Sequence, residues 1–336
     1  MTLLPRLTAL DDVARLALPG PDAAAIEGAR ARQAQLTKPH GSLGRLEDIA
    51  AFMAGWQGTD RPRIDRAQAL VFAGNHGICA QGVNPFPQAV TALMVANFEA
   101  GGAAINQLCR VAGADLGVVA LDLDRPTADF TEGPAMTEAD CLDALNRGAQ
   151  AVDPEADIVI LGEMGIGNST VSAALALAVC GGAAADWVGR GTGSDAAGLA
   201  LKTDVVARGA ARHAGLTPMQ ALAALGGREQ AAICGAVLAA RAARIPVILD
   251  GYICSAAVAP LHGAAPGLLD HCLIGHQSAE PGHVRLCAAM GKAPILSLGM
   301  ALGEGTGAAL ALGVIRGALA CHDGMATFAE AGIGGA

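Results

Sequence analysis

The chain has 336 residues, of which 52% are hydrophobic and 16% are charged, and its formal net charge is −9 at pH 7. This length and apolar content suffice for one large α/β domain with a smaller appendage. The acidic balance, without any cluster of Lys and Arg, excludes the basic surface that nucleic-acid-binding proteins use. We therefore expect small molecules, and no nucleic acid, as partners.

The apolar stretches are too interrupted to predict membrane spans. The two longest, TVSAALALAVCGGAAADWV and GAALALGVIRGALA, are broken by Gly181 and Gly182 and by Arg316, respectively, whereas a spanning helix needs about 20 apolar residues. The first residues include acids and a proline where a signal peptide has a clean apolar run. Nine scattered cysteines without a C-x-x-C pair are typical of reduced thiols in a cytosolic enzyme. We expect a cytoplasmic protein.

In chain order, the first 60 residues predict helices with charged faces, and short apolar runs then alternate with alanine-rich segments. The predicted strands begin at Leu70, Leu116, Asp157, Asp186, Pro246, Cys272 and Pro294, and the predicted helices cover 87–110, 170–180, 194–214, 228–244 and 306 to about 322. This alternation predicts a Rossmann-like α/β fold, a parallel sheet with helices on both faces. We expect residues 61–305 to form the large domain, and residues 1–60 and 306–336 to form a small helical domain together.

Glycine-rich clusters follow six of the predicted strands. In open parallel sheets, ligands bind beyond the carboxyl ends of the strands, and glycine lets the backbone approach a ligand closely. Any one cluster could be an ordinary turn. Six clusters at the same end of successive strands predict a ligand-binding rim.

The cluster GEMGIGNST, residues 162–170, follows one predicted strand and opens a helix. Free backbone amides followed by polar residues at a helix N-terminus favour phosphate binding. The cluster lacks the lysine of a Walker A loop, so a merely capped helix is the alternative. The candidate phosphate ligands here are Gly165, Ile166, Gly167, Asn168, Ser169 and Thr170.

A second cluster, GRGTGSD at residues 189–195, repeats this arrangement after the strand predicted at Asp186. Two such loops on neighbouring strand ends would surround one phosphate from two sides. In the helix that follows, Lys202 lies in the apolar stretch GLALKTDVV, where it either keeps its charge at the surface or presents it to the substrate. The candidate ligands of this loop are Gly191, Thr192, Gly193 and Ser194.

Two glutamates, Glu163 and Glu304, each stand beside glycine just past a predicted strand end. Burial in a crevice would raise the pKa of either carboxyl group, which is the usual route to a general base. A turn or capping acid is the alternative for each residue taken alone. Two such acids at one rim favour a catalytic function.

No metal site is predicted. His271, His276 and His283 are spaced i, i+5 and i+12 across a strand and a loop, and this spacing does not bring them to one point. The G-x-S-x-G turn of many hydrolases is also missing. We therefore expect neither a metal nor another cofactor.

Eight motifs together carry a resemblance to a known family. They occur in order from about residue 38 to 312: KPHGSLGRLE, FAGNHGI, NPFPQAVT, GEMGIGNST, GRGTG with LKTDVV, LDGYICSAAV, GHQSAEPGH and LGEGTGAALA. The chain resembles the nicotinate-nucleotide–dimethylbenzimidazole phosphoribosyltransferases, which make the lower nucleotide loop of cobalamin. The resemblance implies a homodimer of α/β subunits. It also implies transfer of phosphoribose from nicotinate mononucleotide to 5,6-dimethylbenzimidazole, giving α-ribazole 5′-phosphate and nicotinate.

The resemblance also implies roles for single residues. Glu304 falls on the family's general base, and Glu163 lines the same site. Lys202 and Ser278 are expected near the nucleotide, and Gly303 and Gly305 would let the backbone pass beside two flat rings. Some relatives have aspartate where this chain has Asn75, so only a substrate contact, and no charged role, is expected of it. Gln88 is a weaker candidate contact for the acceptor base.

Two alternatives stay open at this point. A non-catalytic nucleotide sensor or scaffold would need the phosphate loops but not two glycine-flanked acids. The same transfer could also use another benzimidazole, adenine or a phenol, because shape decides which base an apolar acceptor pocket takes.

Overall fold

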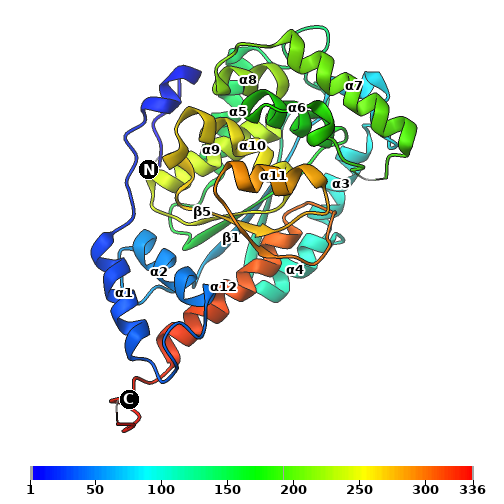
Figure 1. The fold of residues 1–336 in the computed structure, drawn as a ribbon. Helices are drawn as coiled ribbons and strands as arrows, with labels where there is room; N and C mark the ends of the chain where they lie inside the picture. Colours follow the sequence, from blue (N-terminus) through cyan, green and yellow to red (C-terminus); the bar gives the residue numbers. More distant parts are fainter. Residues whose placement is uncertain (1–2, 192, 335–336) are drawn as a thin grey trace.

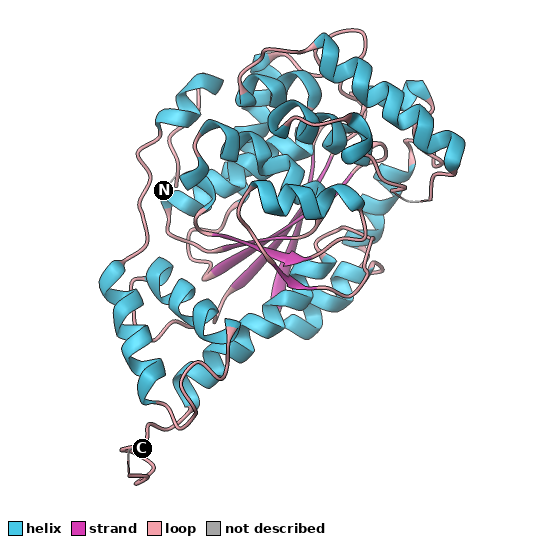
Figure 2. Ribbon diagram, viewed as in Figure 1, coloured by secondary structure: helices cyan, strands magenta, loops and turns pink. Residues whose placement is uncertain are grey.

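The computed structural model describes residues 3–191 and 193–334. At its centre is one six-stranded sheet with the order β2-β1-β3-β4-β5-β6, in which every neighbouring pair is parallel. Figures 1 and 2 show helices on both sides of this sheet, as predicted. Its strands are β1 (Ala67–Ala73), β2 (Ala114–Ala120), β3 (Ile158–Met164), β4 (Val247–Leu249), β5 (Cys272–His276) and β6 (Pro294–Leu296).

Alternate residues of the strands build two separate cores, one on each face of the sheet. In β3, Ile158 and Ile160 point to one face, whereas Val159 and Leu161 point to the other. This follows from the two-residue period of a strand. Both faces are covered, so the central strands are apolar at most positions on either face. That is why the sequence contains continuous apolar runs rather than alternating ones.

Helices cover each face of the sheet. None of the helices in the described part of the chain is both long and apolar enough to cross a membrane. One face carries α2 (Arg45–Gln57), α3 (Val90–Glu99), α4 (Ala104–Ala112) and the first part of α12 (Thr306–Gly324). The other carries α5 (Glu138–Ala151), α6 (Asn168–Cys180), α7 (Ala196–Arg212), α8 (Pro218–Leu225), α9 (Arg228–Ala242), α10 (Tyr252–Ala264) and α11 (Pro281–Ala289).

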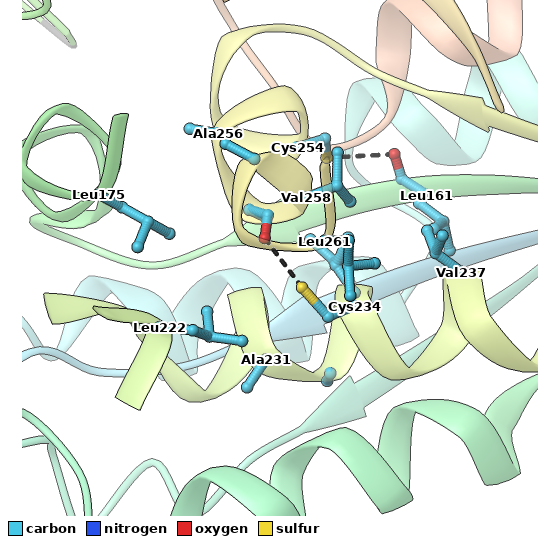
Figure 3. Packing of buried hydrophobic residues seen from close by; sticks show 14 of the residues in the cluster. Leu161, Leu175, Leu222, Ala231, Cys234, Val237, Cys254, Ala256, Val258 and Leu261 are labelled. Atoms are coloured by element: carbon cyan, nitrogen blue, oxygen red, sulfur yellow. Dashed lines mark hydrogen bonds between the residues drawn. The ribbon is translucent and has the colours of Figure 1, made fainter. Parts of the chain in front are cut away.

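Small residues set the helix spacing in the larger core. A Cβ atom at Gly235 of α9 would overlap the backbone carbonyl of Leu145 in α5, so these two helices meet backbone to backbone. Figure 3 shows two buried thiols in the same region. The Sγ atom of Cys234 lies 2.9 Å from the carbonyl oxygen of Ala257, and that of Cys254 lies 3.3 Å from the carbonyl oxygen of Leu161. Both distances fit S–H groups that donate to backbone oxygens.

Both ends of the chain contribute to a second group of helices. α1 (Ala23–Gln35) packs on α2, and α2 packs on α12. Figure 1 shows α1 and α2 in blue beside the red end of α12. Arg32 of α1 donates a 2.8 Å hydrogen bond to the carbonyl oxygen of His322 in α12. Because α12 also contacts β5 and α4, it belongs to both groups, and a domain division at residues 60 and 305 stays a prediction.

Two of the predicted elements differ from the structure. The strand predicted at Asp186 is wrong, because Ala184–Asp186 is a short 3₁₀ helix followed by a loop. Its apolar residues are buried in a turn rather than in the sheet, since the indole N–H of Trp187 donates to the carbonyl oxygen of Gly181 at 2.8 Å. The single helix predicted over 87–110 is divided into α3 and α4, because Gly101 has a φ of +78°. The other six predicted strands are confirmed.

Candidate active site

A pocket opens at the carboxyl ends of the strands. β1 lies between β2 and β3, so the chain changes direction across the sheet at β1 and β3, and ligands of open α/β sheets bind beside such a point. The pocket wall comes from the loops after β1, β3, β4, β5 and β6 and from α7. Its main side chains are Phe86, Glu163, Asn168, Ser169, Lys202, Asp250, Tyr252, His276, Ser278, Glu280, Leu302 and Glu304.

Glu304 stands in a strained turn that leads from β6 into α12. Its φ is +64°, and its neighbours Gly303 and Gly305 have φ values of +83° and +89°. The left-handed conformation costs a residue with a side chain roughly 1–2 kcal/mol, and such strain is concentrated at functional positions. A Cβ atom at Gly162 of β3 would lie 2.6 Å from the Glu304 carbonyl group. Glycine at this position therefore lets the turn rest directly on the strand.

The side chain of Glu304 is held away from solvent. The residue is only 6% exposed, and one of its carboxylate oxygens, Oε2, is buried without a hydrogen-bond partner among the described residues. Burial, with a smaller contribution from the charge of Asp250, raises the pKa of Glu304 to about 7. A carboxylate with this pKa and a free oxygen is suited to accept a proton at neutral pH.

Glu163 is the last residue but one of β3 and faces the same pocket. Its Oε2 atom accepts a hydrogen bond from the side-chain amide of Asn168. A Cβ atom at Gly303 would overlap its other oxygen, so the two glutamates approach each other across that glycine. Burial first, and then the charges of Asp250, Glu229 and Glu304, raise the pKa of Glu163 well above its usual range, against the effect of the Asn168 hydrogen bond.

Lys202 joins the two predicted phosphate loops. It is 3% exposed, and its Nζ atom donates to the Ser169 hydroxyl at 3.0 Å and to the Gly189 carbonyl oxygen at 3.3 Å. Burial lowers the pKa of Lys202, and the charge of Glu280 opposes this effect. A buried ammonium group at a loop before a helix N-terminus is suited to bind an anion. Lys202 is therefore directed into the pocket and does not extend to the surface.

Most of the predicted site residues meet in this pocket. Besides Glu163, Glu304 and Lys202, its wall includes Gly165, Ile166, Gly167, Asn168, Ser169, Gly191, Ser194, Ser278 and Gly303. Thr170 and Gly193 lie outside this wall, and Thr192 lies outside the described residues. The opposite side of the pocket is more apolar, with Val83, Pro85, Phe86 and Leu302. The pocket thus places anion-binding groups, two carboxyl groups and an apolar side around one space.

Asn75 and Gln88 also lie outside the pocket wall. The Asn75 amide donates to the carbonyl oxygen of Leu123 at 2.8 Å, and the Gln88 amide donates to that of His76 at 2.7 Å. The Asn75 side chain therefore ties the loop after β1 to the loop after β2, whereas Gln88 ties together two parts of the segment between β1 and α3. A contact of either residue with a substrate stays a prediction.

Comparison with known proteins decides the family. Residues 18–333 match the family described as "Phosphoribosyltransferase". The nicotinate-nucleotide–dimethylbenzimidazole phosphoribosyltransferase of Rhodobacter capsulatus is 65% identical over 330 residues, which are 98% of this chain and 99% of that protein. The protein of the same name from Ruegeria pomeroyi is 60% identical, with the same shares covered. The chain belongs to the nicotinate-nucleotide–dimethylbenzimidazole phosphoribosyltransferase family.

A solved structure agrees with this assignment. The crystal structure of the phosphoribosyltransferase of this name from Thermus thermophilus is similar with a TM-score of 0.88 at 39% sequence identity, covering 94% of this chain and 100% of that one. The family resemblance and the Rossmann-like fold expected from the sequence are thereby confirmed.

In this phosphoribosyltransferase, one pair of site residues was not found in the sequence analysis. Asp250 directly follows β4, and His276 ends β5, with 3.6 Å between the Nε2 atom of His276 and the Oδ1 atom of Asp250. Asp250 is fully enclosed and accepts two backbone hydrogen bonds from the start of α12. The signal that could have found Asp250 is its position, since it is an acid just past a predicted strand, as Glu163 and Glu304 are.

A second missed pair lies beside the loop of residues 165–169, for which phosphate binding is predicted. The Nε2 atom of His76 is 3.2 Å from the Oε1 atom of Glu229, and both side chains are fully buried. A Cβ atom at Gly165 would lie 2.8 Å from the same His76 nitrogen. The pair therefore supports this loop. His76 follows β1 and Glu229 lies at the start of α9, so the two residues are too far apart in sequence to belong to one motif.

The three histidines of the sequence analysis do not meet. His271 lies outside the pocket wall and bonds to the carbonyl oxygen of Val237 at 3.0 Å. The Nδ1 atom of His283 accepts the backbone N–H of Ser278 at 2.9 Å, and its Nε2 atom lies 3.0 Å from the Ser255 hydroxyl. His283 therefore orients the loop that carries Ser278. Within residues 3–191 and 193–334, no group of three or more His, Cys, Asp and Glu is arranged to hold a metal ion.

Proposed function

We propose that the chain transfers the phosphoribosyl group of nicotinate mononucleotide to 5,6-dimethylbenzimidazole, giving α-ribazole 5′-phosphate and nicotinate, with Glu304 as the general base. The family assignment supports the reaction. The observation that carries the role of Glu304 is its buried carboxylate oxygen, unpaired among the described residues, in the same pocket as Lys202 and the anion-binding loop.

The phosphate of the donor binds at residues 165–169 and Lys202. The N–H groups of Ile166 and Asn168 already donate to the Thr91 hydroxyl and the Gly165 carbonyl oxygen. The N–H groups of Gly167 and Ser169, the positive end of the α6 dipole and the Lys202 ammonium group favour a dianion there. Gly191 and Ser194 close the site from the second loop. This arrangement holds the ribose toward Glu163 and Glu304 on the other side of the pocket.

The chemical step exchanges one C–N bond for another. The unprotonated nitrogen of the benzimidazole attacks C1′ of the ribose. The bond from C1′ to the nicotinate ring breaks, and its electron pair neutralises the pyridinium nitrogen, so the leaving group needs no proton. The proton on the second benzimidazole nitrogen passes to Glu304. Holding both rings and the carboxylate in one dry pocket makes this step effectively unimolecular.

Glu163 acts as a second carboxyl group near the reacting centre. Burial, and then the charges of Asp250, Glu229 and Glu304, raise the pKa of Glu163 well above its usual range, which favours its protonated form. A neutral Glu163 can donate a hydrogen bond in the pocket without adding a second negative charge.

An assay of nicotinate release tests this proposal. With nicotinate mononucleotide and 5,6-dimethylbenzimidazole as substrates, the chain should release nicotinate, and Glu304→Gln should lower the rate about 10²–10⁴-fold, as expected for loss of a general base. Glu132→Gln, at an exposed position, is the matched control and should keep full activity. Binding of the mononucleotide without turnover of any base would favour a sensor or scaffold instead.

We also propose a cytoplasmic homodimer. All nine cysteines lie within the described residues and are unpaired there, which fits a reducing compartment. Helices α3 and α4 both pack beside the edge strand β2. On them, Leu93 is 68% exposed and Val111 is 86% exposed. Exposed apolar surface of this kind marks protein interfaces. In light scattering, Leu93→Glu should convert dimers to monomers, whereas Leu216→Glu, at another exposed leucine, should not. A monomeric wild-type chain would contradict the proposal.

A further inference from the structure

Asp250 is connected to the helix start that directly follows Glu304. Its Oδ2 atom accepts the backbone N–H of Gly305 at 3.1 Å, and its Oδ1 atom accepts that of Ala308 at 2.9 Å. Both donors belong to the first turn of α12, where backbone N–H groups have no partner within the helix. A carboxylate at this place also interacts favourably with the helix dipole. Asp250 therefore fixes the helix start immediately after Glu304.

The strain at Glu304 needs such a fixation. A left-handed residue with a side chain persists only where its surroundings determine its conformation. Thr306 contributes from within the turn, since its hydroxyl donates to the carbonyl oxygen of Gly303 at 2.7 Å. Asp250 contributes from outside the turn, because it directly follows β4, whose position is fixed between β3 and β5. It thus anchors the turn to the rigid sheet.

His276 holds Asp250 in turn. Its ring is enclosed by two glycines, since a Cβ atom at Gly251 would lie 2.7 Å from its Nε2 atom and one at Gly307 would overlap the ring. Asp250 itself is 1% exposed. The arrangement consists of a strand end, a histidine and a helix start, and both Asp250 and His276 are part of the pocket wall.

We propose that Asp250 is a positioning residue for catalysis, which holds the Glu304 carboxylate at the place where it takes the proton from the acceptor base. This inference rests on the proposed function of Glu304. In this proposal Asp250 acts through Glu304, because each of its oxygens accepts a backbone N–H from the helix start that follows Glu304.

The charge of Asp250 provides a readout that a purely structural role would not change. The titratable side chains that line the pocket together with Glu304 are Glu163, Lys202, Asp250, Tyr252, His276 and Glu280, and the N-terminus of α12 follows Glu304 directly. Asp250 is the neighbour that adds to burial in raising the pKa of Glu304. Removing this charge should therefore move the acidic limb of the kcat/KM profile to lower pH.

The experiment is a double-mutant cycle with Asp250→Asn and Glu304→Gln, measured as kcat/KM for nicotinate release. An asparagine side chain has the same shape, but only its oxygen can accept a hydrogen bond. One of the two backbone N–H groups therefore loses its acceptor. Alone, Asp250→Asn should lower kcat/KM about 10–100-fold, the usual cost of displacing a catalytic group by a fraction of an ångström to 1 Å. In the Glu304→Gln background it should lower kcat/KM less than about threefold, because the two residues act as a unit.

Two controls separate this inference from its alternatives. Asp22→Asn removes another helix-capping acid, which accepts the Ala25 N–H at 2.9 Å far from the pocket, and should leave kcat/KM unchanged. Asp250→Ser, with one small acceptor oxygen, enters the same cycle in case the asparagine variant does not fold.

The outcomes distinguish this inference from the proposed function. If Glu304→Gln retains full activity, the proposed function of Glu304 fails. If Glu304→Gln is impaired but Asp250→Asn lowers kcat/KM equally in both backgrounds, or leaves the acidic limb in place, only the positioning role of Asp250 is overturned. Non-additive losses with a shifted acidic limb support it.

Discussion

Lys202 of α7 lies 3.0 Å from the hydroxyl of Ser169 in α6, so a single ammonium group joins two helices whose starts both line the pocket. This contact lies at the proposed phosphate end of the site, and the neighbouring residue Asn168 donates to Glu163. The effect of Lys202 on substrate binding can be measured separately from its effect on the chemical step.

Lys202→Met should weaken donor binding more than it slows turnover. Loss of a charged hydrogen bond costs about 1.5–3 kcal/mol, which corresponds to a KM for nicotinate mononucleotide raised about 10–100-fold. Because the phosphate is held equally in the ground and transition states, kcat should change little. Steady-state kinetics with each substrate varied in turn provide the measurement. Arg212→Met, at the exposed end of α7, is the control, and an effect confined to the KM of the acceptor would contradict the assignment.

The activity should depend on the ionisation of Glu304. Burial raises its pKa to about 7, and a general base acts only when it is deprotonated. The value of kcat/KM should therefore rise with pH through about 7 and level off above it. The profile of Glu304→Gln should lack this limb. A rate that is flat between pH 5 and 8 in the wild-type chain would exclude Glu304 as the titrating base.

Stability should show the opposite trend. The pKa of Glu304 is about 7 in the folded chain and 4.5 for the free side chain, so between these values the folded state binds more protons than the unfolded state. The contribution of Glu304 to stability therefore falls as pH rises from about 4.5 to 7. Thermal melting should show Glu304→Gln to be more stabilising at pH 8 than at pH 5. Glu132→Gln should show no such difference, and equal shifts at both pH values would refute the argument.

Gly303→Ala should impair catalysis beyond its effect on folding. Its φ of +83° strains any side chain, and the added Cβ atom would overlap the carboxyl group of Glu163. Gly299 also has a positive φ, +69°, but only open space around it. Both alanine variants should lose roughly 1–2 kcal/mol of stability from the left-handed backbone, and only Gly303→Ala should lose activity. Melting curves and steady-state kinetics of the two variants test this prediction. Equal activity of the two variants would show that a Cβ atom at residue 303 does not disturb Glu163.

The fold could be predicted because its signals are local. Apolar runs, glycines and helix-length segments identified six strands and the rim where they end. The strand predicted at Asp186 was wrong because Trp187 and Val188 are buried by a turn on α6, and a two-residue apolar run cannot distinguish this from burial in a sheet. The division of residues 87–110 depends on one left-handed glycine, whose φ no apolar pattern encodes.

The site could be predicted where its residues carry their own motif. Glu163 and Glu304 stand beside glycines after strands, and both line the pocket. Asp250 was missed because its partners at Gly305 and Ala308 are more than 50 residues away, and the His76–Glu229 pair joins the end of β1 to α9 in the same way. Pairs of residues that are distant in sequence can be identified only in the structure, where the sheet brings their strands together.

The turn that presents Glu304 is continuous with a rod of 19 residues, about 28 Å long at 1.5 Å per residue. The far end of this rod is held by α2 and by the guanidinium group of Arg32. We therefore expect that a truncation, fusion or crosslink near residue 320 changes how firmly the proposed general base Glu304 is held, although it lies several helical turns away. The C-terminal part of α12 is then a place where activity could be adjusted without altering the pocket.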